Sequence, residues 1–312
     1  MAMSTSPSYD IGATLTRLGA GCSGRLGVAA RLLHEGGAGA SGDVVRWHDE
    51  ERFRTASTVK VAIFAAVMSG VAKGRIELEE RVKVGPGDQT GGSGVLSVLR
   101  TGLAPTVADL CTLMIVVSDN TATNMLIDLV GGVKEVNAAV TSLGFGDITL
   151  HRKLPYPPPP LVAGPMAPLT KDPGAFATAT PAALLRLVSA LRAGTVVDKP
   201  SSELIFRTLE HQQYHSGVPR AFLDLAEPGS APGEWPAVAS KTGSVRGCRA
   251  EVGVIALPGG TDFAYAVMAD DLADTTMSSL SEGDELLGAV GAALLEKWWT
   301  GPGPAPLRPG WP

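Results

Sequence analysis

Strand-like segments lie towards both ends of this chain, and the long segment between them has a helical pattern. Each strand-like segment is a run of apolar or alternating residues between turn-forming residues. They occupy residues 25–33, 44–47, 237–243, 249–258 and 262–271. Because strands need partners to be stable, we expect the two ends of the chain to build one sheet, with the helical middle inserted between them.

The middle of the chain, from Ser57 to about Gly194, has apolar residues at helical spacing. Four helical segments are predicted there, at residues 57–74, 106–131, 132–144 and 180–194. All four end at glycine and three open on Ser or Thr, which are common stop and start signals of helices. Outside this region, helices are predicted near residues 10–18 and 283–299.

This arrangement predicts an α/β (α+β) protein with two domains. Residues 1–52 and 200–312 are expected to form a discontinuous sheet domain, and residues 53–199 a helical domain. The helical domain contains an unusual stretch, residues 151–176, with eight prolines and one acidic residue. The stretch is either a linker or a loop beside a functional site.

Composition excludes several classes of function. The 312 residues are 45% hydrophobic and 18% charged, with a net charge of −5 and no basic run, so a nucleic-acid partner is not expected. The longest apolar runs are too short to cross a bilayer. The three cysteines form no disulfide framework or metal-binding spacing, so we expect no metal and no cofactor. We expect a monomer acting on a small molecule.

The first residues lack a basic segment followed by an apolar one, so no secretory signal is recognised. The expectation is a cytoplasmic protein, or a secreted or periplasmic one if a leader is missing.

The segment TASTVK contains the first candidate catalytic pair, Ser57 and Lys60. If Ser57 opens the following helix, the two side chains share a face one turn apart, with the serine at the positive N-terminal end. A serine hydroxyl needs a base to take its proton, and a neutral lysine can be that base. The alternative is a capped, solvent-exposed helix start.

The segment VVSDNTATN follows an apolar helical run. A turn here can direct the hydroxyl of Ser118 and the carboxamide of Asn120 into a cleft, while Asp119 caps its own backbone. The alternative is a polar connection between two helices.

The third segment, SKTGSVRGCR, lies on a predicted strand. Lys241 supplies a cation and Thr242 a hydroxyl for a substrate carboxylate, and Gly243 permits close backbone approach. The N–H of Ser244 can face a developing oxyanion. The alternative is an edge strand protected by lysine.

The three segments together carry much more information than each alone. Ser-X-X-Lys, then Ser-Asp-Asn 61 residues later, then Lys-Thr-Gly 123 residues further, is the signature set of penicillin-recognising serine enzymes. The chain resembles class A β-lactamases and the related penicillin-binding proteins over nearly its whole length. This resemblance implies a five-stranded antiparallel sheet with flanking helices, an inserted helical domain, and a site in the cleft between them.

The resemblance also implies a role for each residue that reacts. Ser57 is the acylated nucleophile, Lys60 is its base or proton relay, and Ser118 passes a proton to the leaving nitrogen. The backbone N–H groups of Ser57 and Ser244 form the oxyanion hole.

The residues that bind the substrate follow from the same likeness. Asn120 holds the substrate amide, while Lys241 and Thr242 hold the substrate carboxylate. Arg246 and Arg249 are further candidates for carboxylate binding, with solvent-exposed arginines at a strand turn as the alternative.

The chain departs from class A enzymes in the loop that carries their deacylating glutamate. That loop corresponds to the proline-rich stretch, and no glutamate occurs between Glu135 and Glu203. Asp172 is a possible base, although a turn or an ion pair is its expected role. Tyr156 or His151 could instead supply a base from the loop, with packing against the prolines as the alternative.

Loss of a general base costs roughly 10² to 10⁴ in rate, so acylation is expected to survive while turnover is in question. Lys60 could serve as the base in both half-reactions. The first hypothesis is a β-lactamase-family serine hydrolase that acts through an acyl-Ser57 intermediate. The second is an esterase, peptidase or transacylase on the same fold. The third is a penicillin-binding protein that acylates without efficient deacylation.

Overall fold

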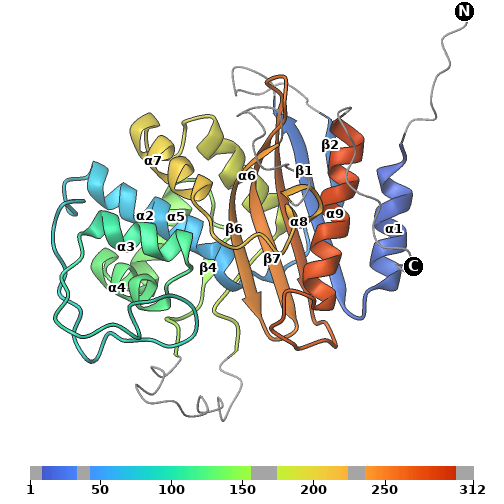
Figure 1. Cartoon of the computed structure of the whole chain (residues 1–312). Helices are drawn as coiled ribbons and strands as arrows, with labels where there is room; N and C mark the ends of the chain where they lie inside the picture. The colour runs from blue at the N-terminus through green and yellow to red at the C-terminus, as the bar shows by residue number, and fades with distance from the viewer. Residues whose placement is uncertain (1–8, 34–42, 156–173, 224–235, 300–312) are drawn as a thin grey trace, which may run out of the picture.

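The computed structural model describes residues 9–33, 43–155, 174–223 and 236–299. Its centre is a five-stranded antiparallel sheet in the order β2-β1-β8-β7-β6 (Figure 1). The strands are β1 (Arg25–Leu33), β2 (Val44–Trp47), β6 (Ala237–Val245), β7 (Cys248–Ala256) and β8 (Asp262–Asp270). The predicted fold class and all five predicted strands are confirmed.

The sheet is assembled from both ends of the chain, as the sequence predicts. β1 pairs with β8 along its whole length, from Arg25 opposite Asp270 to Leu33 opposite Asp262. In Figure 1 the blue strand β1 therefore lies within a sheet whose other long strands are orange. β6 is at the edge of the sheet, so its outer backbone groups are not paired with another strand.

Helices cover both faces of the sheet. One face packs against α1 and α9, at the right of Figure 1, and the other faces the remaining long helices, so each face has its own hydrophobic core. The helices are α1 (Ile11–Gly21), α2 (Lys60–Ala72), α3 (Val107–Val116), α4 (Asn120–Val130), α5 (Val133–Ser142), α6 (Pro181–Arg192), α7 (Lys199–Glu210), α8 (Arg220–Leu223) and α9 (Glu282–Trp298). In the described part of the chain, none of these helices is long and apolar enough to cross a membrane.

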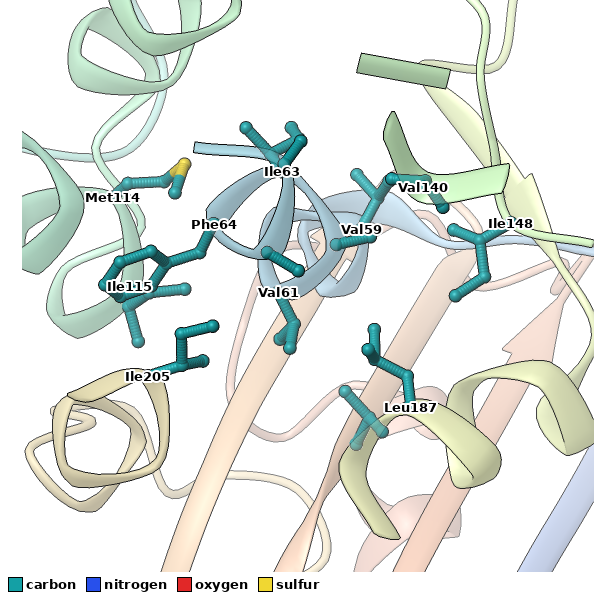
Figure 2. Packing of buried hydrophobic residues seen from close by; sticks show 14 of the residues in the cluster. Val59, Val61, Ile63, Phe64, Met114, Ile115, Val140, Ile148, Leu187 and Ile205 are labelled. Carbon is teal, nitrogen blue, oxygen red and sulfur yellow. The ribbon is translucent and has the colours of Figure 1, made fainter. Parts of the chain in front are cut away.

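Helix α2 is the centre of the larger core. Every residue from Lys60 to Gly70 is buried, which is typical of a helix that is apolar all round. Figure 2 shows side chains of other helices packed around it, including Ile115 of α3, Leu187 of α6 and Ile205 of α7. The first turn of α2 therefore has a fixed position in the protein.

The structure differs from the sequence prediction in the helical region. The predicted helix 57–74 is a 3₁₀ turn, η1 (Ala56–Val59), followed by α2, and the segment 106–131 is divided into α3 and α4 by the turn at Ser118. Helix α7 was not predicted, although Asp198 caps it and Pro200 lies in its first turn.

Three short strands were also not predicted, because two or three residues carry no usable periodicity. β3 (Phe53–Arg54), β5 (Ala177–Ala179) and β4 (Thr149–Leu150) form a small antiparallel sheet beside η1. The domain limits at residues 52/53 and 199/200 stay a prediction, and α6 packs on β1, β7 and β8.

A half-buried ion pair joins this small sheet to the large one. The carboxylate of Asp270, at the end of β8, accepts from the backbone N–H of Arg54 at 2.8 Å and from its Nε at 2.6 Å. Arg54 in turn donates to the backbone carbonyls of Arg246 and Gly247 in the β6–β7 turn. The pair thus fixes the chain three residues before Ser57.

We expect Asp270→Ala to lower the free energy of unfolding by about 2 kcal/mol, because the backbone N–H and the Nε of the half-buried Arg54 lose their charged acceptor. Urea unfolding followed by circular dichroism measures the change. The control is Glu203→Ala, which removes exposed ion pairs to Lys199 and Arg207 and should cost less than about 1 kcal/mol. Equal losses in the two variants would contradict the prediction.

Candidate active site

The candidate nucleophile, Ser57, lies on the 3₁₀ turn that precedes α2, and it is partly exposed. The residue before it, Ala56, has a φ of +46°, a left-handed conformation that costs a non-glycine residue free energy. The surrounding structure compensates: the backbone N–H of Thr55 donates to Ala177 on β5, and Thr58 Oγ1 donates to the carbonyl of Thr55. The turn is held in a strained shape that presents the serine.

Strand β6 lies directly against this turn at Gly243. A Cβ atom at position 243 would be 2.8 Å from the backbone nitrogen of Ser57 and 2.7 Å from the carbonyl oxygen of Thr55. Only glycine permits this approach, as expected from the sequence. The backbone of β6 at Gly243 and the backbone nitrogen of Ser57 are therefore in close contact.

Lys60 is fully buried at the first position of α2. Its Nζ donates to the carbonyl oxygen of Ser118 at 2.7 Å, to Ser118 Oγ at 3.1 Å and to Asn120 Oδ1 at 2.9 Å. Burial holds its pKa well below the ordinary lysine value, the nearby charge of Lys241 lowers it further, and Asp119 opposes the shift. The alternative of a capped, solvent-exposed helix start is wrong, since Lys60 is buried and Ser57 caps nothing.

Ser118 lies in the turn between α3 and α4, and Asn120 is the first residue of α4. Ser118 has a φ of +54°, a second strained non-glycine residue, and is buried. Besides meeting Lys60, Asn120 donates through Nδ2 to the carbonyl of Gly91 at 2.9 Å. The turn brings both side chains to the lysine.

Asp119 has a structural role that exceeds the expected cap. One carboxylate oxygen accepts from Ala122 in the first turn of α4, and the other accepts from Val95 at 2.6 Å and from Leu96 at 2.9 Å. A Cβ atom on Gly94 would lie 2.3 Å from the same oxygen, and the φ of Gly94 is +102°. The hydrogen bonds of Asp119 therefore hold residues 91–96 against the turn that contains Ser118.

Lys241, on β6, is also fully buried, and its Nζ donates to the carbonyl of Thr242 at 2.8 Å. Burial lowers its pKa to about 7, against the opposing effect of the carboxylate of Glu251. Thr242 is partly buried and Ser244 is exposed. Two buried lysines, Lys60 and Lys241, are therefore close enough to influence one another.

The two candidate arginines have different environments. Arg246 is exposed at the β6–β7 turn, in agreement with the alternative. For Arg249 that alternative is wrong: it is 3% exposed, and its Nε donates to Asp284 of α9 at 2.6 Å. Its terminal nitrogens donate to backbone carbonyls, including that of Thr276. Its guanidinium is therefore engaged by Asp284 and by backbone carbonyls, and we do not propose Arg249 as a substrate ligand.

The proline-rich stretch is described only at its two ends. Tyr156 and Asp172 lie outside the described residues, and their roles stay predictions. His151 is exposed, and its Nε2 is 2.9 Å from Thr178 Oγ1 on β5. No cluster of three or more His, Cys, Asp or Glu side chains within the described ranges is placed to hold a metal ion.

The stretch begins at a contact that the sequence analysis missed. Asn124, on α4, accepts from the backbone N–H of Leu154 at 2.9 Å and donates to its carbonyl at 2.9 Å. Its side chain therefore binds both backbone groups of Leu154. Asn124 is four residues after Asn120, on the same face of the helix. This four-residue spacing from Asn120 was the feature of the sequence that could have indicated a role for Asn124. Leu154 is buried in the larger core.

A second missed residue, Gln212, joins the helical region to β6. Its Nε2 donates to the carbonyls of Ile115 on α3, at 3.2 Å, and Ser240 on β6, at 3.4 Å, and it is 2% exposed. Its side chain thus crosses from the end of the helix before Ser118 to the residue before Lys241.

Fold and site together define a protein of the β-lactamase type, with an antiparallel sheet, an inserted helical region, and a serine and buried lysines where they meet. A family model described as the beta-lactamase enzyme family matches residues 11–298. The chain belongs to this family.

Solved structures agree with this assignment. A β-lactamase from Sphaerobacter thermophilus is 32% identical, with a TM-score of 0.74 over 92% of this chain and 95% of that one. An ancestral class A β-lactamase is 27% identical, with a TM-score of 0.72 over 92% and 99%. PBP-A shares the fold at 22% identity, with a TM-score of 0.74 over 92% and 94%.

Proposed function

We propose that the protein is a serine hydrolase that opens a β-lactam, or a related small amide or ester, through an acyl-Ser57 intermediate. The observation that carries the proposal is the contact of buried Lys60 with Ser118 and Asn120, one turn after a partly exposed serine. A buried amine with a lowered pKa can be neutral at working pH, which is the state that a base requires.

In this mechanism Ser57 Oγ attacks the carbonyl carbon and Lys60 accepts the hydroxyl proton. The developing oxyanion accepts from the backbone N–H groups of Ser57 and Ser244. When the C–N bond breaks, Ser118 donates a proton to the leaving nitrogen and regains one from Lys60. Lys241 and Thr242 bind the substrate carboxylate, and Asn120 binds the amide of the substrate side chain.

A second candidate, a penicillin-binding protein that stays acylated, is favoured by the composition of the loop. No glutamate lies between Glu135 and Glu203. The loop residue whose backbone is hydrogen-bonded to Asn124 of α4 is the apolar Leu154. A mutant of PBP-A, a protein of the same fold, has a solved structure as an acyl-enzyme complex with penicillin G. An esterase, peptidase or transacylase activity remains the third hypothesis.

One experiment separates the candidates. The protein is incubated with a chromogenic cephalosporin while colour and intact mass are followed. Steady colour supports the hydrolase, and a one-equivalent burst with a lasting adduct supports the penicillin-binding protein. Neither colour nor adduct, together with turnover of simple esters, would contradict both and support the third hypothesis.

The pH dependence of acylation tests the role of Lys60. We expect the rate constant at saturating cephalosporin to rise with pH through the lowered pKa of Lys60 and then level off, because only the neutral amine accepts a proton. Stopped-flow measurement gives this profile. A rate that keeps rising to about pH 10, the ordinary lysine value, would contradict the prediction.

A matched variant separates the charge from the base. Lys60→Arg keeps a cation that does not deprotonate in proteins, so its acylation rate should fall by about 10³. A Lys60→Ala variant that deacylates a preformed adduct at full rate would exclude lysine as the water-activating base.

A further inference from the structure

A buried carboxylate lies directly behind the strand that carries Lys241. Glu251, on β7, pairs with Thr242 on β6 in the antiparallel register. Paired residues of antiparallel strands share a face of the sheet, so Thr242 is on the same face as Glu251. Because side chains alternate along a strand, Ser240 is also on that face, while Lys241 is on the opposite face. Glu251 is 1% exposed and belongs to none of the three signature segments.

Three donors surround this carboxylate. Ser240 Oγ donates to Oε1 at 2.8 Å, the hydroxyl of Tyr265 on β8 donates to Oε1 at 3.0 Å, and the backbone N–H of Val218 donates to Oε2 at 2.8 Å. A Cβ atom on Gly217 would lie 2.2 Å from Oε2, so any larger residue there would displace the carboxylate. The chain is therefore shaped around the carboxylate.

The groups that Glu251 holds are connected to both sides of the candidate site. Ser240 directly precedes Lys241. Val218 ends the segment 211–218, in which Gln212 contacts α3 and β6 and Gln213 donates through its backbone N–H to Val116 at 3.2 Å. That contact is two residues before Ser118. The carboxylate of Glu251 thus connects β6, which carries Lys241, with the segment 211–218, which contacts the end of α3 before Ser118.

We propose that Glu251 is a positioning residue for this site: from the far face of the sheet it fixes the place of Lys241 and favours the charged form of that lysine. The proposal rests on the proposed function in one respect, the role of Lys241 as the cation that binds a substrate carboxylate.

The charges around Glu251 support this coupling. Burial raises the pKa of Glu251 to about 7 and lowers that of Lys241 to about 7, and each charged form stabilises the other through the strand. Tyr265 stays a neutral donor, because burial raises its pKa. Arg249 and Asp284 neutralise one another, and burial lowers the pKa of His215 on the neighbouring segment.

The first arm of the test needs no substrate. The pKa of the Lys241 amine is measured by NMR of ¹³Cε-labelled lysine in the wild type, Glu251→Gln and Ser240→Ala. Glu251→Gln removes the negative charge, so the pKa of Lys241 should fall by about one unit. Ser240→Ala keeps the charge and should shift it less. An unchanged pKa in Glu251→Gln would overturn the proposal.

The second arm compares a chromogenic cephalosporin with its methyl ester, which lacks the negative charge. Glu251→Gln should raise the half-saturating concentration of the carboxylate form about tenfold, that of the ester much less, and move the alkaline limb for the carboxylate form to lower pH. Equal losses for both compounds, with an unmoved limb, would indicate a merely structural role and overturn the proposal.

The test still decides on Glu251 if the proposed function fails or if Glu251→Gln does not fold. If the wild type forms no adduct, the proposed function fails, and the lysine titration alone decides on Glu251. If Glu251→Gln does not fold, Ser240→Ala decides. Its loss of one link to β6 should weaken binding of the carboxylate form several-fold more than binding of the ester, and equal effects on the two would overturn the proposal.

Discussion

Ser57→Ala is expected to abolish the mass increase that a cephalosporin produces on the wild-type protein. The hydroxyl of Ser57 is partly exposed on a strained turn, one helical turn from a buried lysine whose pKa is lowered. We expect acylation at this oxygen and not at Ser118, because Ser118 is buried and its Oγ accepts a hydrogen bond from Lys60. Intact-mass spectrometry over several hours gives the result directly.

Two neighbouring serines are the matched controls. Ser244→Ala should keep the adduct, because the proposed contribution of Ser244 is its backbone N–H, which the substitution retains. Ser118→Ala should give the same adduct mass at a rate lower by about 10², through loss of proton transfer to the leaving nitrogen. A full adduct on Ser57→Ala would refute the acyl-Ser57 mechanism.

Leu154→Glu should shorten the lifetime of the acyl-enzyme by about 10² or more, the usual contribution of a general base. Asn124 binds the backbone of Leu154 one helical turn after Asn120, which binds Lys60, so we expect a carboxylate at position 154 to reach the water that attacks the acyl group. The carboxylate can take a proton from water as the water oxygen attacks the acyl carbon, and Ser57 then leaves with a proton.

The control is Leu154→Gln, which has nearly the same shape and no base. Both variants bury a polar group in place of leucine, so both should lose stability, and the comparison is limited to the time after acylation. Release of the acyl group is followed by intact mass after excess cephalosporin is removed. Equal lifetimes in the Glu and Gln variants would contradict the prediction.

Local sequence patterns predicted the sheet and most of the long helices, because their apolar periodicity is strong. The motif spacing also predicted residues that the fold brings together: Lys60 meets Ser118 and Asn120 across 58 and 60 positions. The apolar periodicity did not predict the exact start of α2. Ser57 lies on a 3₁₀ turn after a strained alanine, a conformation imposed by packing against β6 and β5.

The supporting residues were hidden for a different reason. Asp119 holds a loop 24 positions away, and Glu251 holds Val218 33 positions away. Neither carboxylate belongs to a pattern that periodicity can detect, since their partners are backbone N–H groups of irregular segments. Arg249 shows the converse: its place beside the Lys-Thr-Gly segment suggested a ligand, yet Asp284 of the last long helix engages it.

The pairing of β1 with β8 has a consequence for how the protein reaches its working state. Arg25 and Asp270 are neighbours in the sheet although 245 positions separate them, and contacts of such long range form slowly because loop closure is entropically costly. On the ribosome, Ser57, Lys60 and Ser118 are made long before Lys241 and Ser244. A nascent chain thus carries Ser57 before the edge strand β6 has been made. Because the proposed oxyanion hole includes Ser244 of β6, we expect covalent labelling of Ser57 only after synthesis and folding are complete.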